Sequence, residues 1–157
     1  MPPAMLYAQL RPTFTHDHYF ANLPTFAKGA KPDLCCTSYG EFVSRGGFTW
    51  DNPPEDAWCP HFIEAGHGTI TIDNGYAMPL GPGDVFIMRP GAFYHRAETK
   101  GKPWRYRWMM IDGTRVEETL ALAGLPCDKV LSRPGLAAKL EPQFAEMRRV
   151  LAGDNPA

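Results

Sequence analysis

This 157-residue chain has no long apolar run, almost no net charge and no paired cysteine motif. No run approaches the roughly 20 apolar residues of a membrane helix, and the N-terminal segment lacks the charged start and apolar stretch of a secretory signal. The chain carries 16 basic and 17 acidic residues, so its net charge of -1 offers no positive field to nucleic acid. We therefore expect a cytoplasmic protein that, on its own, binds neither DNA nor a membrane.

The cysteines give no sign of a disulfide framework or a zinc knuckle. Cys35 and Cys36 are adjacent and would point to opposite faces of a strand, and no two cysteines form C-x-x-C. Free thiols in a reducing compartment are the expected state. Cys59 lies two residues from His61, on the same strand face, but a packed thiol is the better interpretation than a nucleophile. The G-x-S-x-G motif of a serine nucleophile is also missing from the sequence.

Glycine and proline are abundant, with 15 and 16 residues, which is typical of short strands and tight turns. Strand signals are concentrated in residues 33–112. Residues 69–73 alternate with period two, and a turn follows in which we expect positive φ at Asn74 and Gly75. Residues 85–88 read as a short, buried strand. Strands at this spacing predict a small sandwich or barrel.

The two flanks of this β region have different patterns. Residues 1–32 hold five prolines among aromatic residues, so we expect an irregular arm packed on the body, with helical turns around residues 17–28. Residues 113–157 favour two helices, the first with a capping box from Thr114 to Glu117 and a C-terminal cap at Gly124. Pro142 either stands in the first turn of a short second helix or kinks a longer one. The second helix carries an apolar stripe of Leu136, Leu140, Phe144, Met147 and Leu151.

Two motifs in the β region resemble those of a known family. Residues 83–95 (GDVFIMRPGAFYH) are similar to the second cupin motif, and residues 66–70 (GHGTI) resemble the glycine pair that opens the preceding hairpin. Residues 103–108 (PWRYRW), followed by Asp112 and Gly113, resemble the P-W-x-x-x-W stretch in the sensor domains of AraC-type transcriptional regulators.

This resemblance implies a mainly β fold, a cupin-like double-stranded β-helix (a jelly-roll barrel) followed by two C-terminal α-helices. Residues 1–32 would then be the N-terminal arm, residues 33–112 the effector-binding barrel and residues 113–157 a helical segment that pairs two copies in a homodimer. In this family a helix-turn-helix domain follows the sensor domain, and the sequence to Ala157 does not contain one. We expect DNA to be contacted only through a domain outside this chain.

The family's pocket, carried over by its motif, places Tyr106 and Trp108 inside the barrel with His61 on the opposite wall. One extra residue between Gly83 and the motif histidine leaves open which side chains of that strand face inward. An indole face suits the apolar side of a sugar or a planar ring, and phenol and imidazole suit hydroxyls or a carboxylate. We expect a small effector, sugar-like or a small carboxylate, although these aromatics could also simply fill a barrel core. The predicted ligand-binding residues are His61, His95, Arg96, Tyr106 and Trp108.

A single-domain metal-dependent cupin enzyme, an isomerase or dioxygenase, is the alternative function. Its first motif would need H-x-H-x3-E before the closing glycine. The two possible frames place Pro53, Glu55 and Cys59, or Glu55, Ala57 and His61, at those positions. Neither frame gives a ligand triad, and His61 with His95 would be a minimal site, so we expect no metal, no other cofactor and no catalytic residue. A dimerising module without a ligand is the third possibility.

Five basic residues are close in the sequence around the P-W motif. Glu98 interrupts them, and the overall charge opposes a phosphate-binding surface. We expect a solvated strand face and loop made of Arg96, Lys100, Lys102, Arg105 and Arg107.

Overall fold

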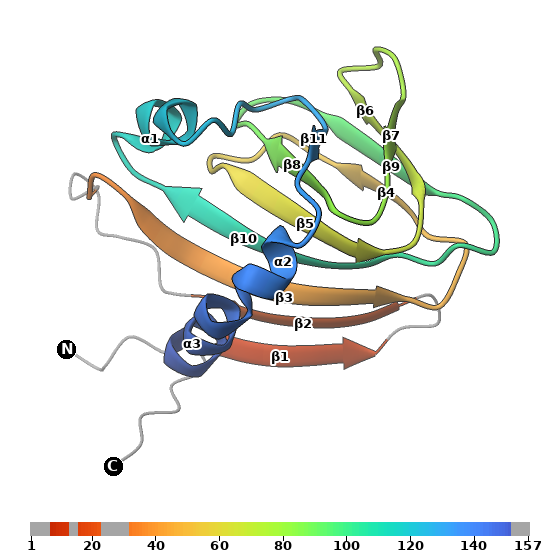
Figure 1. Cartoon of the computed structure of the whole chain (residues 1–157), viewed down its shortest axis with the longest axis horizontal. Coiled ribbons are helices and arrows are strands. Elements are labelled where there is room, and N and C mark those ends of the chain that lie inside the picture. The colour runs from red at the N-terminus through yellow and green to blue at the C-terminus, as the bar shows by residue number, and fades with distance from the viewer. Residues whose placement is uncertain (1–6, 13–15, 23–31, 152–157) are drawn as a thin grey trace.

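The computed structural model describes residues 7–12, 16–22 and 32–151, and it contains two antiparallel sheets with helices against the larger one (Figure 1). The larger, seven-stranded sheet has the order β1-β2-β3-β10-β5-β8-β11, and the smaller sheet has the order β4-β9-β6-β7. The larger sheet consists of β1 (Tyr7–Pro12), β2 (His16–Asn22), β3 (Cys35–Ser44), β10 (Arg105–Asp112), β5 (Cys59–Ala65), β8 (Asp84–Met88) and β11 (Leu131–Ser132). The smaller sheet consists of β4 (Thr49–Asn52), β9 (Tyr94–Glu98), β6 (Gly68–Ile72) and β7 (Met78–Leu80). The mainly β, cupin-like fold expected from the motifs is confirmed.

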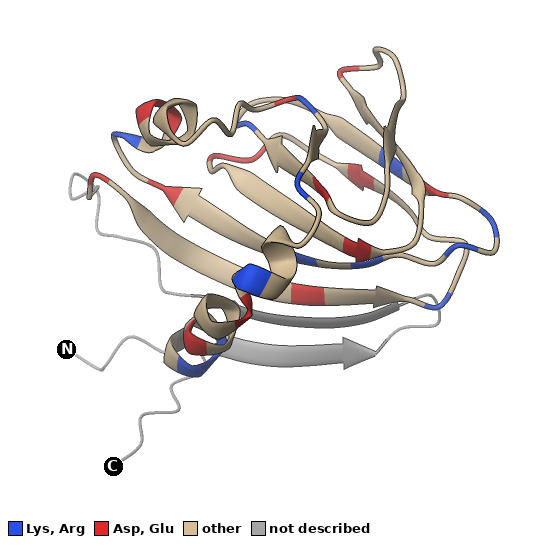
Figure 2. Cartoon of the chain, viewed as in Figure 1, with Lys and Arg blue, Asp and Glu red and all other residues tan. Residues whose placement is uncertain are grey.

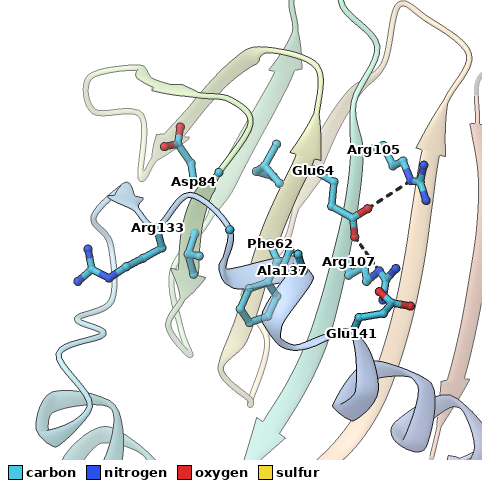
Figure 3. A pocket seen from close by; sticks show the side chains of 13 residues that line it. Phe62, Glu64, Asp84, Arg105, Arg107, Arg133, Ala137 and Glu141 are labelled. Carbon is cyan, nitrogen blue, oxygen red and sulfur yellow. Dashed lines mark ion pairs between the residues drawn. The ribbon is translucent and has the colours of Figure 1, made fainter.

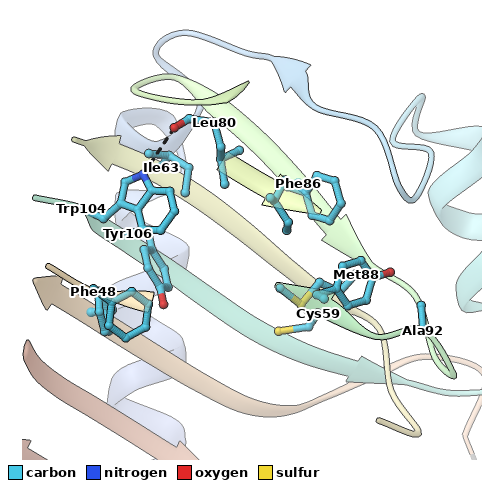
Figure 4. Packing of buried hydrophobic residues seen from close by; sticks show 12 residues of the cluster. Phe48, Cys59, Ile63, Leu80, Phe86, Met88, Ala92, Trp104 and Tyr106 are labelled. Carbon is cyan, nitrogen blue, oxygen red and sulfur yellow. Dashed lines mark hydrogen bonds between the residues drawn. The ribbon is translucent and has the colours of Figure 1, made fainter. Parts of the chain in front are cut away.

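Strand periodicity divides the core into two clusters, one on each face of the larger sheet. On β10, Tyr106 and Trp108 point inward toward the smaller sheet, whereas Met109 and Ile111 point outward. The inner cluster also holds Trp104, whose indole Nε1 donates to the carbonyl oxygen of Leu80 over 3.3 Å (Figure 4). The shared inward face of the aromatic residues at 104, 106 and 108 therefore follows from period-two alternation.

The expected hairpin turn after β6 is present, but its positive φ angles fall one residue early. Asp73 and Asn74 have φ of 47° and 59°, and the N–H of Gly75 donates to the carbonyl of Ile72 over 2.8 Å. Asp73 is held in this conformation because its carboxylate accepts the N–H of Phe93 over 2.9 Å.

The N-terminal segment differs from the expected irregular arm. Residues 7–12 and 16–22 are strands, and β2 pairs with β3 along its whole length. Helical turns around residues 17–28 are therefore wrong for residues 17–22, and the rest of that stretch lies outside the described residues. The reason is tertiary: an exposed edge of β3 offers backbone partners to any extended segment, which overrides local preference.

Three helical segments replace the two expected helices. They are α1 (Val116–Leu122), α2 (Leu136–Lys139) and α3 (Glu141–Leu151). Pro142 is the second residue of α3, so the first-turn alternative is confirmed. Gly124 has φ of 69° after α1, as a C-terminal cap requires. The capping box is wrong, because Arg115 is the N-cap without a side-chain bond and the hydroxyl of Thr114 donates to Asp33 instead.

The apolar stripe of the last two helices, from Leu136 to Met147, covers the larger sheet of its own chain. Phe144 is 1% exposed and packs against Tyr39 and Phe62, with ring centroids 5.9 and 5.3 Å away. The stripe could either cover the barrel or pair with a second copy, as the resemblance favours; Phe144 covers the sheet of its own chain. Alternate residues of β3, β5 and β8 make the outer sheet face apolar, and that face has to be covered. In the described part of the chain no helix is long and apolar enough to cross a bilayer.

Candidate functional site

A cavity of about 200 Å³ lies between the two sheets, at the end where β4 and β9 face β3, β5 and β10. Four of the five predicted ligand-binding residues, His61, Arg96, Tyr106 and Trp108, line it. The structure thus brings together residues that are up to 47 positions apart in the sequence.

Aromatic rings form most of the cavity wall. Tyr106 stacks on Phe42 with centroids 4.5 Å apart, and Phe42 in turn lies 4.5 Å from Phe48. Trp108 is in register with Gly40 on β3, and a Cβ at Gly40 would overlap the indole ring. Glycine at this position therefore lets the indole of Trp108, which lines the cavity, lie directly over the β3 backbone.

Arg96 is the charged group of the inner wall. It is 6% exposed, and its Nη1 donates to the hydroxyl oxygen of Tyr106 over 2.8 Å while its Nε donates to Oδ1 of Asn52 over 3.1 Å. The guanidinium also lies 5.4 and 5.8 Å from the ring centroids of Tyr106 and Phe48, within cation–π range. The expectation of a solvated basic face is therefore wrong for Arg96. Burial raises the pKa of the Tyr106 hydroxyl, so Tyr106 stays a neutral hydrogen-bonding group.

His61 lies beside Trp108 and not across the cavity from it. The two residues are in register on neighbouring strands β5 and β10 of the same sheet, so the predicted placement on the opposite wall is wrong. His61 is buried, and its Nδ1 is 3.0 Å from the carbonyl oxygen of Cys59. Because a carbonyl only accepts, Nδ1 carries the proton in the neutral ring and Nε2 is an acceptor.

His95 lies outside the cavity, so its expected place in the pocket is wrong. Its side chain is 44% exposed, and its Nδ1 is 2.6 Å from Oδ1 of Asp51. Alternation along β9 turns Tyr94 and Arg96 inward and the residue between them outward. Tyr94 is occupied structurally, since its hydroxyl donates to Asp128 over 2.6 Å and accepts the N–H of Arg89 over 2.8 Å.

The cavity offers little to a metal ion or a nucleophile. Within residues 32–150, whose side chains are described, no group of three His, Cys, Asp or Glu residues could hold a metal. Cys59 lines the cavity beside His61, but burial raises the pKa of its thiol to about 12. The thiol is therefore neutral near pH 7, which supports its interpretation as a packing residue.

A second, wider hollow of about 610 Å³ lies on the outer face of the larger sheet, between β5, β8, β10 and α2 (Figure 3). Glu64 lies between Arg105 and Arg107, with N–O distances of 3.3 and 2.7 Å, and Arg107 also contacts Glu141 over 2.6 Å. Figure 2 shows the acidic segments of β5 and β3 on either side of the basic segment of β10. Because the central charges of this outer groove neutralise one another, we favour the smaller inner cavity as the binding site.

Sequence reasoning missed the residues that β4 and the preceding loop contribute to the cavity. Phe48 lines it from the loop, and Trp50 and Asn52 line it from β4, a strand of only four residues. Such a short strand next to two prolines gives almost no periodic signal. The aromatic residues two positions apart, Phe48 and Trp50, are the signal that could have indicated a cavity wall.

Comparison with known proteins agrees with this geometry. A family described as the AraC-like ligand binding domain matches residues 46–155. The Msm operon regulatory protein of Streptococcus mutans is 27% identical over 120 residues, which are 76% of this chain and 41% of that protein. The raffinose operon transcriptional regulatory protein RafR of Pediococcus pentosaceus is 29% identical over 115 residues, 72% of this chain and 41% of RafR. This chain thus spans about two fifths of the length of either relative.

Solved structures show the same fold at low sequence identity. The plu4264 protein of Photorhabdus luminescens has a TM-score of 0.51 at 11% identity, covering 74% of this chain and 91% of that one. An oxalate decarboxylase variant of Bacillus subtilis has a TM-score of 0.51 at 12% identity, covering 75% of this chain and 35% of that one. These likenesses show the fold and carry no information on activity.

Proposed function

This chain belongs to the AraC-like ligand-binding domain family, and we propose that it senses a small effector in the cavity between its two sheets. The observation that supports this most strongly is the convergence of His61, Arg96, Tyr106 and Trp108 on one aromatic cavity. Aromatic walls with a few placed polar groups are typical of small-molecule sites. A volume of about 200 Å³ is below the range of about 300–1000 Å³ of drug-sized sites, so we expect a ligand of about one ring.

The names of the two relatives support a proposal for the wider role. Both are named as regulators of operons, one of them the raffinose operon. We propose that this chain is the sensor half of a cytoplasmic regulator of the same kind, which forms a homodimer and controls transcription through a DNA-binding domain outside the chain. The effector would be sugar-like or a small carboxylate, and the chain would perform no chemistry on it.

Calorimetry with conservative variants tests the location of the site. Trp108→Phe keeps a ring but removes the wide indole face, and Tyr106→Phe keeps the ring but removes the hydroxyl. Each variant should lower the affinity for the effector about tenfold, or about 1.4 kcal/mol. Trp58→Phe is the matched control, because Trp58 packs in the outer cluster on the other side of the sheet. If both cavity variants bind as tightly as the control, these aromatics only fill the core and the site lies elsewhere.

A further inference from the structure

Arg96 is a buried cation without a carboxylate partner among the described side chains. Its partners among the described side chains are an amide oxygen, a hydroxyl and two aromatic rings, all of which are neutral. Other arginines that are more exposed do contact carboxylates, among them Arg89 with Asp128 and Arg149 with Glu146. A charge that is removed from water is costly unless an opposite charge compensates it. Among the described side chains, no carboxylate thus pairs directly with this guanidinium.

The acidic residues nearest to the cavity do not fill that place. Glu55 lines the cavity from its exposed rim, and no ion pair joins it to Arg96. Glu98 lies two residues further along β9. Its Oε2 accepts the N–H of Trp104 over 2.9 Å, and its buried Oε1 has no hydrogen-bond partner among the described residues. Neither carboxylate contacts the guanidinium of Arg96.

The guanidinium still has donors to offer. Of its five N–H groups, one at Nε and one at Nη1 are used, and Nη2 has no acceptor among the described residues. Asn52 and Tyr106 hold the group from two sides, and Arg96 lines the cavity. A planar guanidinium that is fixed in this way matches the two oxygens of a carboxylate.

We propose that the effector carries a carboxylate, which Arg96 binds through its unused donors while the ring of the effector lies against the aromatic wall around Trp108. This inference rests on the proposed function and narrows its ligand class to one-ring acids. A sugar acid and an aromatic acid share this chemistry, since both combine a carboxylate with a face that stacks on an indole. A neutral sugar would bury the guanidinium further without supplying the missing charge.

Matched pairs of acid and ester test the proposal on the unaltered chain. We would titrate D-galacturonate and its methyl ester, and benzoate and methyl benzoate, into the protein by calorimetry. At least one acid should bind ten or more times more tightly than its ester, because only the acid compensates Arg96, and the preferred pair separates a sugar acid from an aromatic acid. Arg96→Gln should abolish the preference for the acid. Arg105→Gln, which removes an exposed charge of the outer groove, should keep it.

Other results would overturn the inference in distinguishable ways. An ester or D-galactose that binds as tightly as the acid shows that the carboxylate is not recognised, and leaves the proposed sensor function standing. If both acids fail to bind, the inference is wrong, and if D-galactose also fails to bind, the proposed function falls with it. Circular dichroism checks the fold of Arg96→Gln. Tyr106→Phe is the second variant, because it keeps the charge but frees Nη1, and it should reduce the acid preference without abolishing it.

Discussion

Two arginines on opposite sides of the seven-stranded sheet have very different surroundings. On the outer face, Arg107 is 13% exposed, lies 4.9 Å over the ring of Phe144, and contacts both Glu64 and Glu141. On the inner side, the more deeply buried Arg96 meets only neutral groups among the side chains that the structure describes. The first arginine joins the helices to the sheet, whereas the second faces a cavity.

This difference separates a structural role from a binding role. A buried ion pair is balanced within the protein, and breaking it leaves an uncompensated charge. A buried cation whose partners are neutral gains a compensating charge only when an anionic ligand binds. A sensor can use this difference between its free and bound states. The outer face should therefore decide stability, and the inner side should decide ligand binding.

The largest effect on stability should come from the outer cluster. Phe144→Ala removes a ring that is almost fully buried against Tyr39 and Phe62, so it should lower the free energy of unfolding by about 3–5 kcal/mol. Leu122→Ala, at a residue that is 81% exposed on α1, should change it by less than about 0.5 kcal/mol. Urea denaturation measures both. Equal effects would show that α3 is not part of the core.

Removal of the charge should cost more stability at Arg107 than at Arg96. Arg107→Met leaves Glu64 partly buried beside only one arginine, so it should cost about 1–3 kcal/mol of stability. Arg96→Met should stay within about 1 kcal/mol of the wild type, because the loss of two hydrogen bonds is offset by relief of an unpaired charge. Urea denaturation of the ligand-free proteins measures both changes. The double variant Glu64→Gln/Arg107→Met should recover part of the stability lost in Arg107→Met, because it also removes the carboxylate charge. A larger loss of stability in Arg96→Met than in Arg107→Met would contradict the assignment of a structural role to Arg107 and a binding role to Arg96.

Local pattern was enough to predict much of the fold. The alternation of residues 69–73, the apolar run 85–88 and the tryptophans around Tyr106 all indicated strands, because each depends only on near neighbours. The strand β2 was missed, because its partner β3 lies about twenty residues further along the chain, and β1 was missed with it, because it pairs with β2. Thr114 failed as a cap because Asp33, distant in the sequence, binds its hydroxyl.

The candidate site was predictable only in part. Alternation correctly placed Tyr106 and Trp108 on one face, but it cannot give the order of strands in a sheet, so His61 was placed on the wrong wall. The burial of Arg96 could not be read from a basic stretch that looked solvated. It depends on the opposing sheet and on Asn52, which comes from a strand with almost no sequence signal.

The inner cavity should also make stability sensitive to alkaline pH. Burial raises the pKa of Cys59 from 9.0 to about 12, so the folded state keeps a proton that the unfolded chain loses. This contribution is complete below pH 9 and is lost as the pH rises from 9 toward 12, by at most about 1.4 kcal/mol per pH unit. Cys59→Ala should flatten urea midpoints measured from pH 8.5 to 10.5. Cys35→Ala, at a thiol with less burial and a smaller rise in pKa, should change the slope less. A slope unchanged by Cys59→Ala would mean that the thiol reaches water in the folded state.

The smallest effect should come from His95, which makes it the sharpest test of which side of β9 faces the ligand. His95 precedes Arg96 directly, yet its ring is half exposed and meets an exposed carboxylate of Asp51. An exposed pair of this kind contributes about 0–1 kcal/mol, and the imidazole is charged only when it is protonated. We expect His95→Ala to change stability by less than about 0.5 kcal/mol and to leave the binding of a D-galacturonate or benzoate probe unchanged, whereas Arg96→Gln next to it abolishes the acid preference. Calorimetry on these two variants compares the opposite faces of β9 at adjacent residues. Circular dichroism verifies that both variants are folded. Equal losses of binding would place the ligand at the outer surface of the smaller sheet, because only there could His95 contact it.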